Sequence, residues 1–152
     1  MSNAAAEESH PPVAHYDPPP GLDAAIHAVP LVEAAMSPKK VGYLTNYSFH
    51  IWYQIVIEVM KRRGLQYGIE LEVLDAGLSV ENQIAQAREL AQRVDALVLT
   101  PANTSGLEEV LTIAADANVP VVVEANPVEG MATMGAICDY DAGFDLGKWV
   151  GN

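Results

Sequence analysis

The stretch VDALVLTPANTSGLEEVLTIAADANVPVVV, residues 94–123, decides the fold. Residues 95–100 read as a short apolar strand closed by Pro101, and residues 119–124 form a second strand rich in valine. Between them, apolar residues recur at helical spacing, namely Leu107, Val110, Leu111 and Ala114. A strand, a crossover helix and a further strand in this order predict a parallel unit with the helix packed on the sheet.

The same alternation continues toward the amino terminus. Strands are predicted over 41–45 and 69–75, and the helix between them ends near Gly64 and Gly68. Its predicted inner face consists of Ile51, Trp52, Ile55, Val56, Val59 and Met60. Ser79 is placed to cap a third helix, with an inner face of Val80, Ile84, Ala87 and Ala91.

Two further features complete the pattern. Ser105 and Glu108 have the spacing of a capping box, which predicts the start of the helix within the opening stretch. Residues 134–137 predict a fifth strand, and a last helix begins near Ala142. The fold class that follows is α/β, a three-layer sandwich in which a parallel sheet is flanked by helices.

This pattern covers residues 40–152, which we expect to form one domain. Residues 1–39 are rich in proline and alanine, and we expect an extended tail. Within them, residues 22–36 have helical character that Pro30 interrupts, which predicts a short helical segment.

Composition limits the function. The net charge of −12 argues against a nucleic-acid partner. No apolar run is long enough to span a bilayer, and the four histidines lack metal-ligand spacing with acidic partners. Catalytic signatures such as G-x-S-x-G, H-E-x-x-H and the P-loop are also missing, so we expect neither an enzyme nor a cofactor.

The strongest functional signal is VGYLTNYSFHIWY, residues 41–53, which holds half of the aromatic residues of the chain. It begins as a buried strand and runs into a helix, so its rings and polar groups lie at the carboxyl end of a strand. Ligands of open α/β sheets bind at that edge, and a ring face with polar groups at its rim suits a small polar molecule.

Five segments in order resemble the type 1 periplasmic solute-binding proteins, in the sugar-binding group that includes the ribose-binding protein. They are VGYLTNYSFHIWYQIVIEVMKRRG, IELEVLDA, VENQIAQARELAQ, the opening stretch and CDYDAGFDLGKWV. The resemblance implies an extracytoplasmic receptor of an ABC importer that binds a carbohydrate-like solute between two lobes and delivers it to a membrane permease. It also implies that this chain holds only the amino-terminal lobe, which we expect to self-associate when isolated. The resemblance further implies a periplasmic location, and we expect no signal peptide within residues 1–39.

Family members carry an Asn-Pro-aromatic-aromatic motif where this chain reads His50-Ile51-Trp52-Tyr53. The resemblance therefore implies that Trp52 and Tyr53 stack on the ligand, although their helical phase fits burial equally well. His50 either bonds a ligand hydroxyl or carboxylate, or serves the loop.

Four other polar residues follow strand ends. The resemblance makes Asn46, Asn103, Asn126 and Asp139 candidate ligand contacts, with turn or helix-cap roles as the alternative. At the fourth strand end the family often shows Asp-Arg, and this chain has Ala125-Asn126 instead. Asp75 more often supports the loop in this family.

Two other functions use related folds. A ligand sensor feeding a membrane kinase or chemoreceptor stays open, whereas a LacI-type regulator would need a helix-turn-helix before residue 40, which the sequence does not show. A phosphorelay receiver would need an acidic pair after the first strand, where Thr45-Asn46 stands.

Overall fold

The computed structural model describes residues 39–135 and 139–151, without the side chains of 139–142 and 145. Residues 1–38 of the predicted tail, including the helical segment over 22–36, lie outside these ranges, as do residues 136–137 of the predicted fifth strand. Lys39, which is predicted as part of the tail, instead begins the first strand of the sheet, where it pairs with Ile69. The elements are β1 (Lys39–Thr45), α2 (Ile51–Gln66), β2 (Ile69–Asp75), α3 (Val80–Leu90), β3 (Ala96–Leu99), α4 (Glu108–Asp116), β4 (Val121–Glu124), β5 (Met134–Gly135) and α5 (Asp139–Val150).

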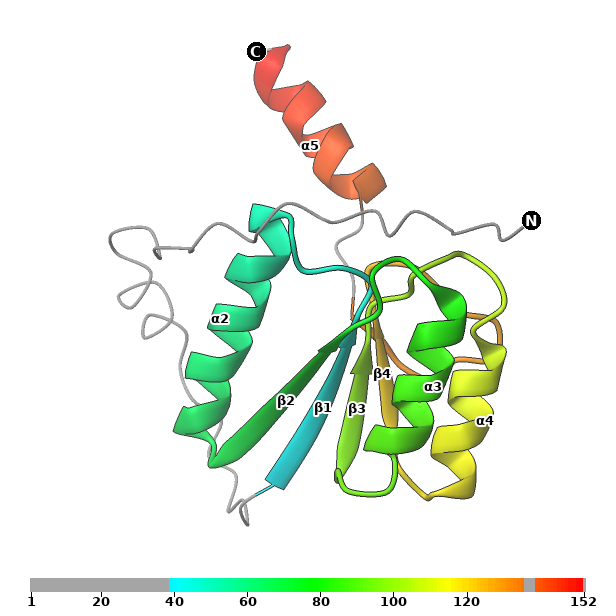
Figure 1. Ribbon diagram of the computed structural model, residues 1–152. Helices are drawn as coiled ribbons and strands as arrows, with labels where there is room; N and C mark the ends of the chain where they lie inside the picture. Colours follow the sequence, from blue (N-terminus) through cyan, green and yellow to red (C-terminus); the bar gives the residue numbers. More distant parts are fainter. Residues whose placement is uncertain (1–38, 136–138, 152) are drawn as a thin grey trace, which may run out of the picture.

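The strands form one parallel sheet in the order β2-β1-β3-β4-β5. Helix α2 lies on one face of the sheet, and α3 and α4 lie on the other (Figure 1). The predicted fold class is therefore confirmed. Because all strands run in the same direction, their carboxyl ends meet at one edge of the sheet, called the carboxyl edge below. Helix α5 stands beyond this edge, apart from the sheet (Figure 1).

The core lies between the sheet and the α3–α4 pair. Its fully buried side chains include Leu44, Leu90, Leu97, Leu99, Val110 and Val123. Gly42 of β1 lets α3 approach closely, because a Cβ atom built there would lie 2.8 Å from both Leu90 Cδ1 and Leu97 Cδ2. The alternating apolar residues predicted from sequence thus form the interior that fixes the carboxyl edge.

The capping box predicted at the start of α4 is wrong. Helix α4 begins after Leu107, and no side chain caps it, so Ser105 and Glu108 do not form a capping box. Gly106 turns the chain with a φ of 84°, and the fully buried Leu107 fixes the start of the helix. By contrast, Ser79 caps α3 as predicted, because its Oγ accepts from the Asn82 amide at 3.1 Å.

The inner face predicted for α2 is also wrong at its beginning. Ile51 and Trp52 are 50% and 53% exposed, whereas Ile55, Val56, Val59 and Met60 are half-buried. The first turn of α2 follows the loop that leaves the carboxyl edge, and the sheet cannot cover it there (Figure 1). The exposed ring of Trp52 is therefore available at the edge where ligands bind in such sheets.

Candidate functional site

Three backbone hydrogen bonds join the loops at the carboxyl edge. The Ala76 amide donates to the Thr45 carbonyl at 3.0 Å, and the Leu78 amide donates to the Asn46 carbonyl at 2.8 Å. The Thr100 amide donates to the Leu44 carbonyl at 2.9 Å. The loops that follow β1, β2 and β3 are thus held against one another, and they carry most of the candidate residues.

Asn46 is buried and serves the turn after β1. Its Oδ1 accepts from the Tyr47 amide at 2.8 Å, and its Nδ2 donates to the Tyr53 hydroxyl at 3.0 Å. The turn role set against ligand contact in the sequence analysis is therefore present. Because Tyr53 accepts this bond, its own hydroxyl hydrogen is left to donate to a further acceptor.

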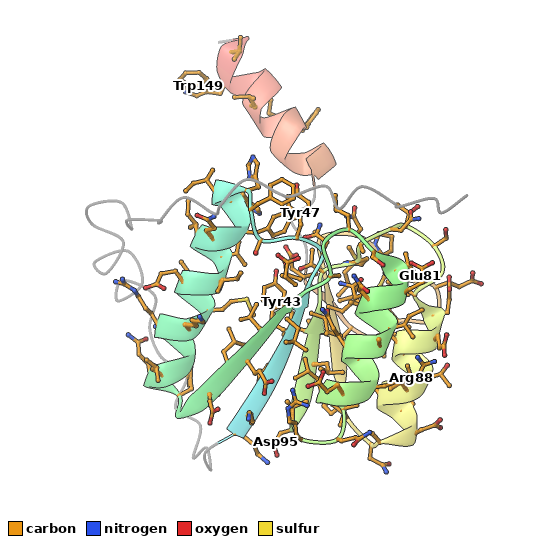
Figure 2. The ribbon with its side chains drawn as sticks, in the orientation of Figure 1. Tyr43, Tyr47, Glu81, Arg88, Asp95 and Trp149 are labelled. Carbon is orange, nitrogen blue, oxygen red and sulfur yellow. The ribbon has the colours of Figure 1, made fainter. Side chains whose placement is uncertain are left out.

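Aromatic rings gather beside this turn. Tyr47 stacks on Phe49 with ring centroids 4.5 Å apart, and it meets Tyr53 edge-on at 4.8 Å. Tyr47 lies at the carboxyl edge near the start of α2 (Figure 2). Tyr53 is thereby packed and half-buried, whereas Trp52 presents half of its surface to solvent. Of the two predicted stacking residues, Trp52 has the accessible ring.

His50 is the N-cap of α2. Its backbone is extended, and its Nδ1 accepts from the Trp52 amide at 3.1 Å. One ring nitrogen is therefore committed to the helix, and it fixes the backbone that carries Trp52. The side chain is exposed, so the other ring nitrogen faces outward.

The remaining candidates lie at the ends of later strands. Asn103 is exposed and its Oδ1 accepts from the Thr104 amide at 2.7 Å, as a turn residue does. Asn126 is exposed beyond β4, and Asp139 is the first residue of α5, with a side chain outside the described part. The structure brings Asn46 and Tyr53 into contact and places Asn103 and Asn126 on the same edge.

Asp75 supports the loops. Its Oδ2 accepts from the Ser48 amide at 2.8 Å and from the Ser48 hydroxyl, and its Oδ1 accepts from the Gly77 amide at 2.7 Å. Both carboxylate oxygens are thus engaged. The supporting role that the family resemblance implied for Asp75 matches this geometry.

A buried polar chain at the carboxyl edge was missed in the sequence analysis. The Thr100 hydroxyl donates to Glu124 Oε2 at 2.7 Å and lies 2.8 Å from the Tyr43 hydroxyl. Because the single Thr100 hydrogen goes to Glu124, Tyr43 is the donor to Thr100. Burial raises the pKa of Tyr43, which keeps its phenol protonated as this geometry requires. Tyr43 lies between the sheet and α2 (Figure 2).

Gln83 of α3 is a second residue that was missed. It is fully buried, its Nε2 donates to the Thr100 carbonyl at 2.9 Å and the Leu44 carbonyl at 3.3 Å, and its Oε1 accepts from the Ala102 amide at 2.9 Å. One signal could have revealed it, since Gln83 is three residues after Val80 and four before Ala87, on the inner face of the predicted helix.

The backbone at the end of β4 is strained. Ala125 has a φ of 66°, and the Asn126 amide donates to the Glu124 carbonyl at 2.9 Å. A hydrogen bond across one residue with positive φ defines a γ-turn of the uncommon, strained kind. This turn directs the chain so that Glu124 and Asn126 both stand at the carboxyl edge.

Replacing Ala125 with Gly is expected to raise the free energy of unfolding by about 0.5–1 kcal/mol, because glycine adopts positive φ without the Cβ clash. Ala125 is exposed, so the change removes no core contact. Urea unfolding of the two proteins followed by circular dichroism tests this. Ala125→Val is the matched control and should destabilise; equal stability of all three would contradict a strained turn.

The positively charged side chains lie mainly at the end of the sheet opposite the carboxyl edge. All lysines and arginines except Lys148 lie at the start of β1 or in and after the last turns of α2 and α3: Lys39, Lys40, Lys61, Arg62, Arg63, Arg88 and Arg93. The loops over 46–50, 76–79, 100–107 and 125–133 at the carboxyl edge contain none. The candidate site therefore offers acidic and neutral groups from these loops, and no cation.

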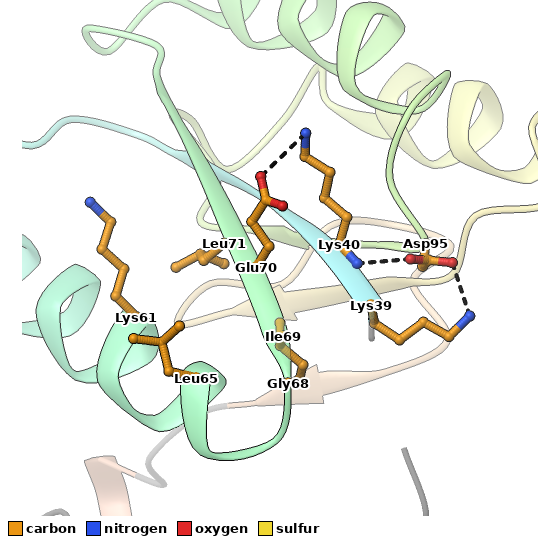
Figure 3. Close-up of a pocket in the computed structure, with 9 residues that line it drawn as sticks. All are labelled: Lys39, Lys40, Lys61, Leu65, Gly68, Ile69, Glu70, Leu71 and Asp95. Carbon is orange, nitrogen blue, oxygen red and sulfur yellow. Dashed lines mark hydrogen bonds and ion pairs between the residues drawn. The ribbon is translucent and has the colours of Figure 1, made fainter. Parts of the chain in front are cut away.

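An open groove of about 740 Å³ lies at the opposite end, between α2 and the amino ends of β1 and β2 (Figure 3). Its charged groups are largely paired, because Asp95 accepts from Lys39 Nζ at 2.9 Å and from the Lys40 amide at 2.8 Å. The backbone bond from Lys40 and then the Lys39 ammonium lower the pKa of Asp95. This groove lies at the end of the sheet opposite the loops that carry Asn46, Asn103 and Asn126.

Other kinds of site find no support in the described ranges. Among these residues, no three or more His, Cys, Asp or Glu side chains gather as metal ligands would. In the same part of the chain, no helix is both long and apolar enough to cross a membrane.

Comparisons with known proteins show which family this chain resembles. A family model described as a periplasmic binding protein domain matches residues 41–151. The galactofuranose-binding protein YtfQ of Escherichia coli (strain K12) is 37% identical over 100 residues, which cover 61% of this chain and 31% of that protein.

Two solved structures have the same fold. The periplasmic binding protein component of the arabinose ABC transporter from Shewanella sp. ANA-3, bound to α- and β-L-arabinofuranose, matches with a TM-score of 0.64 and 31% identity over 73% of this chain and 39% of that one. A galactofuranose-binding protein matches with a TM-score of 0.65 and 29% identity over 74% of this chain and 40% of that one. This chain thus spans less than half the length of each relative.

Proposed function

Because this chain belongs to the periplasmic binding protein domain family, we propose that it is one lobe of an extracytoplasmic receptor that binds a sugar or sugar-like solute and delivers it to an ABC importer. Two of the relatives named above are galactofuranose-binding proteins, and the third is bound to arabinofuranose. This supports a carbohydrate ligand. The role is binding without chemical turnover, since these relatives are solute-binding proteins.

The exposed Trp52 ring carries this proposal. The side chain is 53% exposed at the carboxyl edge, and the His50 cap holds the backbone amide of Trp52. The same segment carries the polar groups of Asn46 and Tyr53, which are hydrogen-bonded to each other. A flat ring with hydrogen-bonding groups at its rim suits the apolar face and hydroxyl edge of a sugar. Half of such a site is sufficient for contact, and the second lobe would complete it by closing over the solute.

Helix α5 fits this two-lobe proposal. It leaves the carboxyl edge, and its large apolar side chains Phe144, Leu146, Trp149 and Val150 are more than half exposed. Because an apolar helix face is stable when it is covered, we propose that α5 leads into the second lobe and packs there. This differs from the sequence interpretation, in which the helix was the last one of the first lobe.

A thermal-shift screen of the full-length, two-lobe protein tests the function. Sugars and polyols are expected to raise the melting temperature, because a ligand that binds only the folded state stabilises it by mass action. Arabinose and galactose head the panel, and small carboxylates serve as the comparison class. No shift with any sugar or polyol, followed by no heat of binding in calorimetry, would contradict the proposal.

A further inference from the structure

Glu124 differs from the other carboxylates at the carboxyl edge. It ends β4, it is half-buried, and its Oε2 accepts from the Thr100 hydroxyl at 2.7 Å. Its Oε1 has no hydrogen-bond partner among the residues that the structure describes, in contrast to Asp75, whose two oxygens are both engaged. Glu124 therefore keeps one acceptor oxygen available at the place where the solute would lie.

The position of Glu124 is set by the buried chain beneath it. Tyr43 donates to Thr100, and Thr100 donates to Glu124, so two hydrogen bonds in series point their donors toward the carboxylate. Both Tyr43 and Thr100 are fully buried. A carboxylate supported in this way is oriented before any ligand arrives, which reduces the entropy lost on binding.

Among the residues that the structure describes, no positive side chain pairs with this carboxylate. The loops of the carboxyl edge contain no lysine or arginine, and no ion pair of Glu124 occurs within the described ranges. The amino ends of α3 and α4 bring partial positive charge to the same edge, but Glu81, Glu108 and Glu109 in their first turns offset it. Closure of a second lobe would then remove water from a carboxylate that lacks a counter-charge, which is costly.

We propose that Glu124 selects the solute, and that the preferred solute carries a protonated amine on a polyhydroxyl frame, as amino sugars and amino polyols do. This inference rests on the proposed function, because it assigns the ligand class of the same site. The ammonium group supplies the missing counter-charge and a charge-assisted hydrogen bond to Oε1. A neutral sugar supplies only a hydroxyl donor, and a sugar acid is repelled.

The test is a calorimetric titration of the full-length protein with matched triplets of solutes. Each triplet shares one frame in neutral, amino and acid forms, for example galactose, galactosamine and galacturonate, or glycerol, serinol and glycerate. The amino form is expected to bind about tenfold or more tightly than the neutral form, and the acid form more weakly than both.

The Glu124→Gln variant provides the decisive comparison, because glutamine still accepts the Thr100 hydroxyl. It is expected to lose the preference, with about tenfold or more weaker binding of the amino form and little change for the neutral form. Glu129→Gln, at an exposed position of the loop that follows β4, removes the same charge elsewhere and should keep the preference.

The outcomes separate the two proposals. Binding of neutral forms as tightly as amino forms would overturn the role of Glu124 and leave the sugar receptor standing. A preference that survives Glu124→Gln would also overturn it. If no triplet member binds, the proposed function and this inference both fall.

Discussion

Replacement of Gln83 by leucine is expected to lower the free energy of unfolding by about 3 kcal/mol, because it leaves buried backbone groups without partners. Leucine fills a similar volume but cannot donate to the Thr100 carbonyl or accept from the Ala102 amide. The Leu44 carbonyl keeps its bond from the Thr100 amide and contributes little to the loss. Urea denaturation followed by circular dichroism measures the change.

The matched control is Gln92→Leu, at an exposed position just after α3, which should change stability by less than about 0.5 kcal/mol. The Gln83→Glu variant distinguishes hydrogen bonding from packing. A carboxylate there would face two carbonyl oxygens, so its pKa would be raised in the folded state above the unfolded value. Its stability deficit is then expected to grow as the pH rises from about 4 to about 7. A Gln83→Leu protein as stable as the parent would show that α3 needs no such link to β1 and β3.

Replacement of Trp52 by alanine is expected to weaken solute binding by the full-length protein about tenfold or more, because it removes the accessible stacking face. Trp52 is 53% exposed, so the variant should keep its melting temperature without ligand close to that of the parent. Isothermal titration with a solute from the thermal-shift screen measures the affinity.

Two further variants sharpen this result. Trp52→Phe keeps an aromatic face and should retain most of the affinity, whereas Leu65→Ala, 74% exposed at the other end of α2, should have no effect. Unchanged binding by Trp52→Ala would mean that the solute lies elsewhere on the carboxyl edge, and the assignment of the stacking residue would be wrong.

The sheet and its helices could be predicted because buried positions recur at regular spacings along the sequence, with one period for strands and another for helices. The valines of β4 and the alternation in β2 reflect strands whose neighbours are fixed by parallel crossovers. Periodicity reports the phase of a helix but not the length of the sheet beneath it. That is why Ile51 and Trp52 were assigned to the buried face although α2 begins at the open carboxyl edge.

The polar part of the site was harder to predict. No local pattern singles out Gln83, Tyr43 or Glu124. Their roles arise from hydrogen bonds that span 17, 57 and 24 positions of the chain, respectively. Sequence patterns carry local spacing, so they could place Asn46 in a turn and His50 in the loop before α2. They could not join β1, β3 and β4 through hydroxyl groups. The wrong capping box has a similar origin, because the buried Leu107 overrides the local preference of Ser105.

The two tryptophans of this chain lie in separate places, Trp52 at the start of α2 and Trp149 on α5, and both are more than half exposed. Because indole emission responds to its immediate surroundings, the fluorescence of this chain is the sum of two reporters. One stands at the carboxyl edge and the other on the helix that leaves it. Spectroscopy on chains that keep only one of the two indoles could therefore follow solute arrival and the movement of α5 as separate signals.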